Sequence, residues 1–198
     1  LQASALSGTT IRVRLGTTQA QVDGTAPYDS GAQPFINPAI SQEDGLYHSH
    51  LEIPSPITAR WWRIDIGGHT GDFEAANLII GQKTTATRYY DRNFEFGVQD
   101  LGEQEYGRWG VSEENEGLIF RTITFKLPWV VGAEFEGGWR PLIEKVGKRK
   151  PVLICFDPQA TAYRQAKTYF GTFRDTPFAT GGTKPGTYSM EYSLLSYI

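Results

Sequence analysis

The stretch at residues 58–81, TARWWRIDIGGHTGDFEAANLIIG, carries the clearest structural signal in this chain. In its first half, one face of an alternating pattern is formed by Trp62, Ile64 and Ile66, and the other by Trp61, Arg63 and Asp65. A period of two predicts a half-buried β-strand, because successive side chains leave opposite faces of the pleat. A Gly-Gly pair ends this strand, and residues 76–80 predict a second strand, closed by a glycine. Two strands around a short loop favour antiparallel β-structure.

The composition indicates a globular protein built from short strands. The chain has 198 residues, enough for one large domain or two small ones with a buried core. Ten Tyr, eleven Phe and five Trp occur with 22 Gly and 11 Pro, a mixture that favours strands joined by turns. The net charge of −3 gives no general attraction to nucleic acid or to an anionic membrane. No run approaches the roughly 20 apolar residues that cross a bilayer, so membrane insertion is not expected.

The single cysteine and the start of the chain add two expectations. Cys155 is the only cysteine, which excludes an internal disulfide, and its apolar neighbours predict a buried, inert thiol. Residues 1–8 begin with Leu1 and lack the basic start and long apolar core of a signal peptide. We therefore expect either a fragment or a chain numbered from an internal residue.

The first half of the chain reads as strands separated by irregular segments. Residues 10–15 alternate as an amphipathic strand, with Ile11, Val13 and Leu15 on one face. Residues 16–37 predict a long loop that carries one short strand, and residues 46–53 predict an edge strand bounded by prolines. A polar segment at residues 82–95 marks the transition between two predicted domains, 1–85 and 86–198.

The second half combines several strands with one helix. Strands are predicted at 94–99, 118–127, 152–156, 167–173 and 187–198, and a charged loop at 100–116. The continuously apolar run at 152–156 predicts a central strand covered on both faces. The helical stripe consists of Trp139, Leu142, Ile143 and Val146, with Pro141 in its first turn and Gly147 at its end. The whole chain therefore predicts a mostly β, β-rich α+β fold.

No motif of an enzyme or a metal site stands out. His48 and His50 could share a metal with His69, Asp72 or Glu74, but two solvent-facing histidines on a polar segment are the simpler interpretation. A glycosidase needs two facing carboxylates, and the spacing of the acidic residues selects no such pair. The Gly-Gly-Thr-Lys run at 181–184 lacks the first glycine of a phosphate-binding loop and predicts a hairpin tip. We expect no catalysis, no cofactor and no metal.

The remaining candidates are binding residues. Trp61 and Trp109 could stack on a sugar ring or anchor a partner protein, with Arg63 and Asp65 beside Trp61. Trp139 belongs to the helix stripe and is assigned to the core. The basic residues at 145–150 could touch nucleic acid, but a helix C-terminus attracts lysines through its dipole, and the chain is acidic.

Several short motifs support a family resemblance. In the first half these are LSGTTIRV at 6–13, YDSG at 28–31, RWWRI at 60–64 and LIIG at 78–81. In the second half they are FDP at 156–158 and YFG at 169–171, set among a long strand, a helix and a closing strand. Together they resemble minor tail and baseplate proteins of long-tailed bacteriophages and gene-transfer-agent-like particles. The N-terminal part is similar to the galactose-binding-like, discoidin-type β-sandwich.

This resemblance implies a jelly-roll-like β-sandwich in 1–85, followed by a smaller α+β tail-protein domain. In the family, further strands precede the segment matching 6–13, so they are either missing here or donated by a neighbour. The implied function is that of a structural subunit of a phage tail tip or baseplate. It would be made in the bacterial cytoplasm, located in the virion, and associated with other tail proteins as a homo-oligomer or on a ring. A carbohydrate-binding module that recognises host glycan is the alternative.

Overall fold

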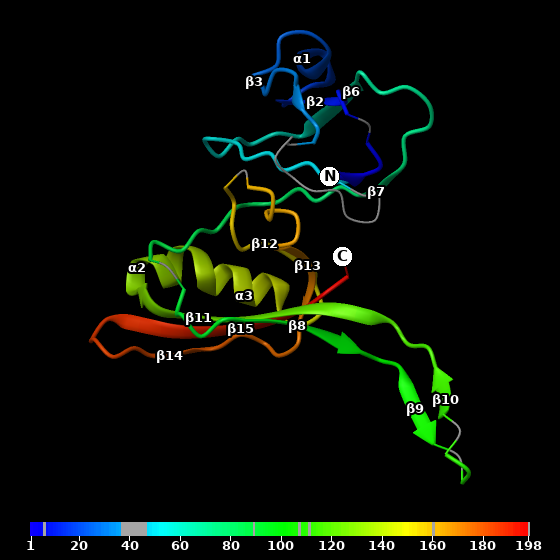
Figure 1. Cartoon of the computed structure of the whole chain (residues 1–198). Helices are drawn as coiled ribbons and strands as arrows, with labels where there is room; N and C mark the ends of the chain where they lie inside the picture. Colours follow the sequence, from blue (N-terminus) through cyan, green and yellow to red (C-terminus); the bar gives the residue numbers. More distant parts are fainter. Residues whose placement is uncertain are drawn as a thin grey trace. The chain divides into compact units, whose positions relative to one another are not determined.

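The structure, a computed structural model, describes residues 1–5, 7–36, 47–88, 90–106, 108–110, 112–159 and 161–197. The predicted β-rich α+β fold is confirmed, with antiparallel sheets and one main helical segment (Figure 1). The chain forms two compact units: unit 1 contains Leu1–Gln82 and Asp157–Lys167, and unit 2 contains Lys83–Phe156 and Thr168–Ile198. The division into domains 1–85 and 86–198 stays a prediction.

Unit 1 contains two small antiparallel sheets. The larger one is centred on β2 (Thr10–Gly16), which pairs with β6 (Trp61–Gly67) along one edge. The other edge of β2 pairs with β3 (Tyr28–Asp29) and β4 (Gln33–Pro34). The smaller sheet has the order β5 (Tyr47–His48), β1 (Gln2–Ala3), β7 (Ala75–Asn77). A short helix, α1 (Gln19–Asp23), follows β2.

The core of unit 1 follows the alternation of its two longest strands. Ile11, Val13 and Leu15 of β2 are buried, and Ile64 and Ile66 of β6 pack against the same cluster. The smaller sheet contributes buried apolar residues to this cluster from its own side, so the core is shared by both sheets. The predicted inward face of residues 10–15 is therefore confirmed, and so is that of Ile64 and Ile66. Trp62, which was predicted on the same face of β6, is 39% exposed and lies outside the core cluster.

Three details of unit 1 differ from the sequence prediction. The strand predicted at 76–80 is β7, which ends at Asn77 and pairs with β1, not with β6. The loop predicted at 16–37 contains α1 as well as two short strands, and its last residue lies outside the described residues. The edge strand predicted at 46–53 is reduced to β5, and residue 46 is also outside the described part.

Unit 2 is built on a six-stranded antiparallel sheet. Its main path runs through β12 (Val152–Cys155), β13 (Thr168–Phe173), β15 (Thr187–Ser196), β11 (Ile119–Val131) and β8 (Glu95–Asp100). A short strand, β14 (Ala179–Gly181), pairs with the start of β15. The helical segment after β11 consists of α2 (Gly132–Glu134), the π-helix η1 (Phe135–Trp139) and α3 (Arg140–Val146). This segment covers one face of the sheet (Figure 1).

The helix stripe packs on the longest pair of strands as predicted. Trp139 is buried, and Leu142, Ile143 and Val146 pack against the same core. The opposing sheet residues are the inward-facing side chains of β11 and β15, namely Ile123, Phe125, Leu127, Met190, Tyr192 and Leu194. The helical segment begins earlier than predicted, because the π-helical turn accommodates two glycines that disfavour a regular helix.

Two predictions for unit 2 are wrong. The apolar run at 152–156 forms β12, an edge strand of the sheet, and Leu153 on it is exposed. The charged loop predicted at 100–116 contains a hairpin of β9 (Glu103–Tyr106) and β10 (Ser112–Asn115). The first error arises because hydrophobicity alone does not state whether a strand has one neighbour or two. The second arises because a polar, exposed hairpin lacks the apolar alternation by which strands are predicted.

The buried face of β15 gives the first test. We expect Leu194→Ala to lower the free energy of unfolding by about 2–5 kcal/mol, because Leu194 is fully buried and its truncation leaves a cavity. Urea unfolding followed by circular dichroism measures the change. Leu118→Ala is the matched control, since Leu118 is mostly exposed, and an equal loss in both variants would contradict the assigned core.

Candidate functional site

Three of the four residues selected from the sequence share the outer face of β6. Trp61, Arg63 and Asp65 alternate along the strand with the core-facing Ile64 and Ile66. Trp61 lies opposite Gly16 at one end of the β2–β6 ladder and is 40% exposed. Its ring is therefore accessible to a ligand or a partner.

The two charged residues beside Trp61 are engaged within unit 1. Arg63 donates from Nη1 to Asp23 Oδ1 of α1 at 2.7 Å and from Nε to Asp65 Oδ1 at 2.8 Å. Asp65 also accepts a hydrogen bond from Arg14 Nη2 at 2.7 Å through its Oδ2 atom. This ion-pair cluster connects β2, β6 and α1. The side chains of Arg63 and Asp65 are therefore engaged in contacts within unit 1.

Arg14 is the unusual member of this cluster, because only 8% of the residue is exposed. Within the described part of the chain its Nε atom has no hydrogen-bond partner. The pKa of Asp65 is lowered below its ordinary value by the hydrogen bond from Arg63, which has the larger effect, and by the one from Arg14. A buried guanidinium thus depends on a carboxylate that stays ionised.

A second ion pair lies at the other edge of β2. Arg12 donates from Nε to Asp29 Oδ1 of β3 at 2.8 Å, and its Nη2 donates to Oδ2 of the same carboxylate. These bonds, together with one from the backbone N–H of Gly31, hold the pKa of Asp29 well below its ordinary value. The outer face of the larger sheet is therefore crossed by arginine–carboxylate pairs from three strands and a helix.

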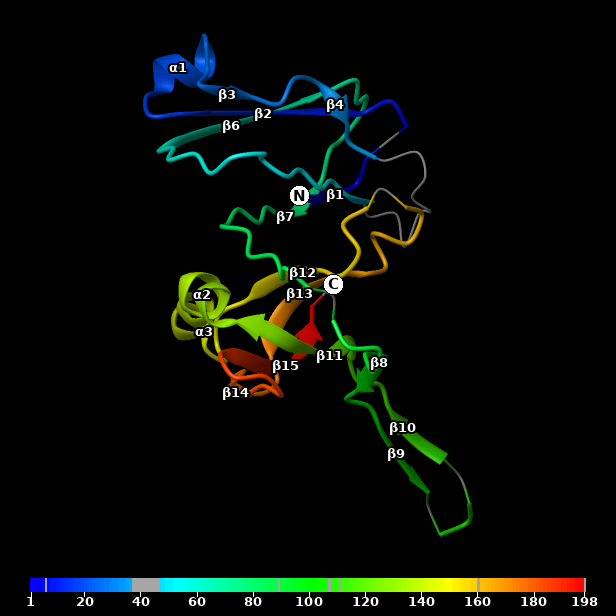
Figure 2. The same ribbon diagram turned by 90° about the vertical axis from the view of Figure 1, so that its left-hand side faces the viewer.

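Trp109, the fourth selected residue, lies in unit 2 and is not part of this cluster. It follows Arg108 in the turn between β9 and β10, is 88% exposed, and has the Arg108 guanidinium 6.0 Å from its ring centroid. We call β9, β10 and the turn residues 108–110 the arm. Figures 1 and 2 both show the arm extending beyond the end of the sheet formed by β8 and β11.

The arm is acidic and presents aromatic side chains to solvent. Residues 100–116 contain six acidic residues and a single basic one. Tyr106 at the end of β9 is 70% exposed. Glu103 and Glu105 lie on the same face of β9 and are both exposed, so like charges are neighbours on this strand.

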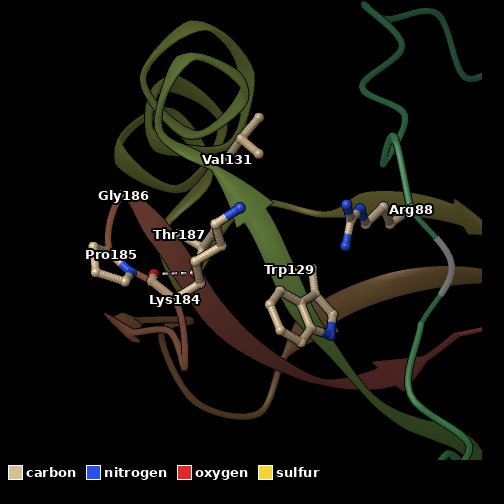
Figure 3. Close-up of a pocket in the computed structure, with 7 residues that line it drawn as sticks. All are labelled: Arg88, Trp129, Val131, Lys184, Pro185, Gly186 and Thr187. Carbon is tan, nitrogen blue, oxygen red and sulfur yellow. Dashed lines mark hydrogen bonds between the residues drawn. The ribbon is translucent and has the colours of Figure 1, made fainter.

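A pocket of about 370 Å³ lies at the opposite end of β11. It is lined by Arg88, Trp129, Val131, Lys184, Pro185, Gly186 and Thr187 (Figure 3). The guanidinium of Arg88 is 5.6 Å from the ring centroid of Trp129, within the range of a cation–π contact. Figure 3 shows Arg88 and Lys184 on either side of this ring, and we call the site the cationic pocket.

The walls of the cationic pocket are set by a break in the β11–β15 ladder. The register shifts between Leu127 and Val130, which are both buried, so Trp129 points outward between them. The turn from Lys184 to Thr187 is closed by hydrogen bonds from the Thr187 hydroxyl and N–H to the Lys184 carbonyl, at 2.6 and 3.1 Å. Gly186 in this turn has a φ of 78°, a conformation that suits glycine.

Sequence reasoning missed the cationic pocket and the partners of Arg14. Lys184 was correctly placed in a hairpin tip, but nothing in its neighbourhood indicates that Arg88 and Trp129 lie nearby. The one available signal for Trp129 was Pro128, since a proline inside a strand indicates a bulge or an edge. The carboxylates that pair with Arg12 and Arg14 come from distant segments and leave no local pattern.

The histidines considered for metal binding contact different groups. His50 Nε2 is 3.2 Å from Glu52 Oε1, while His69 Nε2 is 2.8 Å from the carbonyl oxygen of Asp72. Over the residues that the structure describes, no group of three or more His, Cys, Asp or Glu side chains is arranged to hold a metal ion. The helices in that same part of the chain are all too short or too polar to span a membrane.

The ion-pair cluster generates the second test. We expect Asp65→Asn to lower the free energy of unfolding by about 1–3 kcal/mol at neutral pH, because Arg14 then stays buried without a carboxylate. Urea unfolding followed by tryptophan fluorescence measures this loss. Asp72→Asn is the control, since the Asp72 side chain forms no ion pair among the described residues.

The wild type and Asp65→Asn should also differ in how their free energies of unfolding depend on pH. Because the folded-state pKa of Asp65 is lowered, its stabilisation is present above the ordinary carboxyl pKa of about 4 and is lost as the pH falls through the folded-state value. The stability difference between wild type and Asp65→Asn should therefore shrink in acid. A difference that stays constant with pH would show that lost charge is not the cause.

Comparison of the chain with protein-family models finds no match, and comparisons with curated proteins and with solved structures find none either.

Proposed function

We propose that this chain is a structural subunit of a phage tail tip or baseplate that acts by docking to other proteins and not by catalysis. The motif resemblance supports the assignment to tail proteins. The observation that carries the docking role is the arm, whose strand β9 is exposed along its length and whose turn holds Trp109. The proposed location is the virion, and no cofactor is required.

The arm is unfavourable in an isolated chain. A two-stranded hairpin is marginally stable by itself in water, and the excess of acidic residues in 100–116 weakens it further. Large exposed aromatic side chains such as Tyr106 and Trp109 are the residue types that anchor protein interfaces. An arm of this composition is stabilised when a partner covers it, so we assign it to the subunit interface.

The partners follow from this role. Other tail or baseplate proteins are the proposed neighbours, together with further copies of this chain in a homo-oligomer or on a ring. Unit 1 would contribute through its exposed β6 end near Trp61.

Removal of the arm tests the proposal. Replacing residues 103–115 by a two-residue Asn-Gly turn should keep the fold, because the β8–β11 ladder supports the junction. We expect the shortened chain to be folded by circular dichroism but absent from assembled particles in an incorporation assay. Tyr163→Ala changes an equally exposed aromatic outside the arm and should still be incorporated. Normal incorporation of the shortened chain would refute the docking role.

A carbohydrate-binding module is the second candidate, favoured by the exposed ring of Trp61 on the outer face of β6. The docking proposal predicts that the wild-type chain binds none of the glycans on a glycan array. If the wild-type chain binds a glycan, and Trp61→Ala or Trp109→Ala abolishes this binding with the fold intact, the module is favoured instead. Arg63→Lys is the informative companion, because Arg63 is engaged with Asp23 and Asp65 and should not affect sugar binding.

A further inference from the structure

The arm presents a surface that is complementary in charge to a cation. Glu103 and Glu105 lie two residues apart on β9 and therefore on the same face of the hairpin. This face therefore carries two exposed glutamates, Glu103 and Glu105. Repulsion among like charges is relieved when cationic groups bind between them.

The cationic pocket offers such groups together with an apolar wall. Within the described part of the chain, Arg88 and Lys184 form no ion pair with a carboxylate, so both charges remain available. Trp129 is 37% exposed between them, and Val131 and Pro185 add apolar surface. The pocket can therefore receive carboxylates and an aromatic side chain at one place.

The other basic surface of unit 2 is a poorer match. Lys145, Lys148, Arg149 and Lys150 gather at the end of α3, where they complement the helix dipole. The Nζ atom of Lys148 already lies 3.7 Å from Oδ1 of Asp175, so this lysine is paired with a carboxylate.

The arm and the cationic pocket of one chain cannot meet. The arm is attached where β8 and β11 begin their ladder, at Asp100 and Ile119, and the pocket includes Trp129 on the same β11 strand. Trp129 lies ten residue steps along the strand from Ile119, a distance of about 33 Å. Figure 2 shows the arm extending away from β14, the strand that precedes the turn lining the pocket. Any contact between them must involve two molecules.

We infer that the acidic arm of one copy docks in the cationic pocket of a second copy. This inference rests on the proposed docking function and names the partner of the arm. Glu103 and Glu105 pair with Arg88 and Lys184, and the aromatic rings of the arm cover the apolar wall around Trp129. The contact joins different surfaces of the two copies, so it is heterologous and propagates into a ring or a filament.

Charge reversal of the full-length chain tests the contact. The arm variant is Glu103→Lys with Glu105→Lys, and the pocket variant is Arg88→Glu with Lys184→Glu. Each should weaken self-association by about tenfold or more, because like charges then face each other, and each should be folded by circular dichroism. Light scattering behind a sizing column, over a range of protein and salt concentrations, measures the mass.

Restoring the opposite charges supplies the decisive result. A chain that carries all four reversals, and an equimolar mixture of the two variants, should regain the oligomers that each variant alone has lost. Lys148→Glu with Arg149→Glu is the matched control and should assemble like wild type. The inference is overturned if the fourfold variant stays monomeric, if the pocket variant assembles normally, or if the wild type is monomeric throughout.

The outcome also separates this inference from the proposed function. If removal of the arm prevents incorporation into particles while the pocket variant is incorporated normally, the arm docks on another protein. The proposed function then stands and the self-docking inference fails. If the arm is dispensable for incorporation, the docking function itself fails.

Discussion

The antiparallel ladder between β11 and β15 is the constraint on which unit 2 depends. It supplies the inward faces that receive Trp139 and its helix stripe, and it brings the β14–β15 turn beside Trp129. A paired strand cannot stretch or shorten, because each residue advances it by a fixed rise. The ladder therefore holds the root of the arm and the cationic pocket at a fixed separation. The geometry of any assembly built through these surfaces is set by the length of a single strand.

Unit 1 depends on a different balance, in which apolar and ionic contacts occupy opposite faces of the same strands. Leu15 and Val13 face the core, while Arg12 and Arg14 pair with carboxylates of β3 and β6. On β6, Arg63 pairs with Asp23 of α1. Arginine forms directional, charge-assisted hydrogen bonds, so these pairs fix the position of α1 and β3 more than they add to the hydrophobic core. A small core is thus given a defined arrangement by charges on its outer face.

Local pattern is sufficient to predict most strands and the helix, because the alternation in 10–15 and the stripe from Trp139 to Val146 are set by burial on one face. It failed where a property depends on distant partners. The run at 152–156 is apolar enough for a central strand, yet its place in the sheet is decided by the order in which other strands pair. The same holds for the site. Trp61 and Trp109 could be selected as exposed anchors, whereas the cationic pocket arises only when Arg88, Trp129 and Lys184 converge from three segments.

The course of the chain between the units has a consequence for how such a protein can diversify. Asp157–Lys167 leaves unit 2 after β12 and joins unit 1 before β13 begins, and its Gln165 side chain accepts a hydrogen bond from the His48 backbone. Exchange of residues 1–82 alone would separate this segment from the neighbours it has in unit 1. Unit 1 is therefore transferable as a module only when both pieces move together.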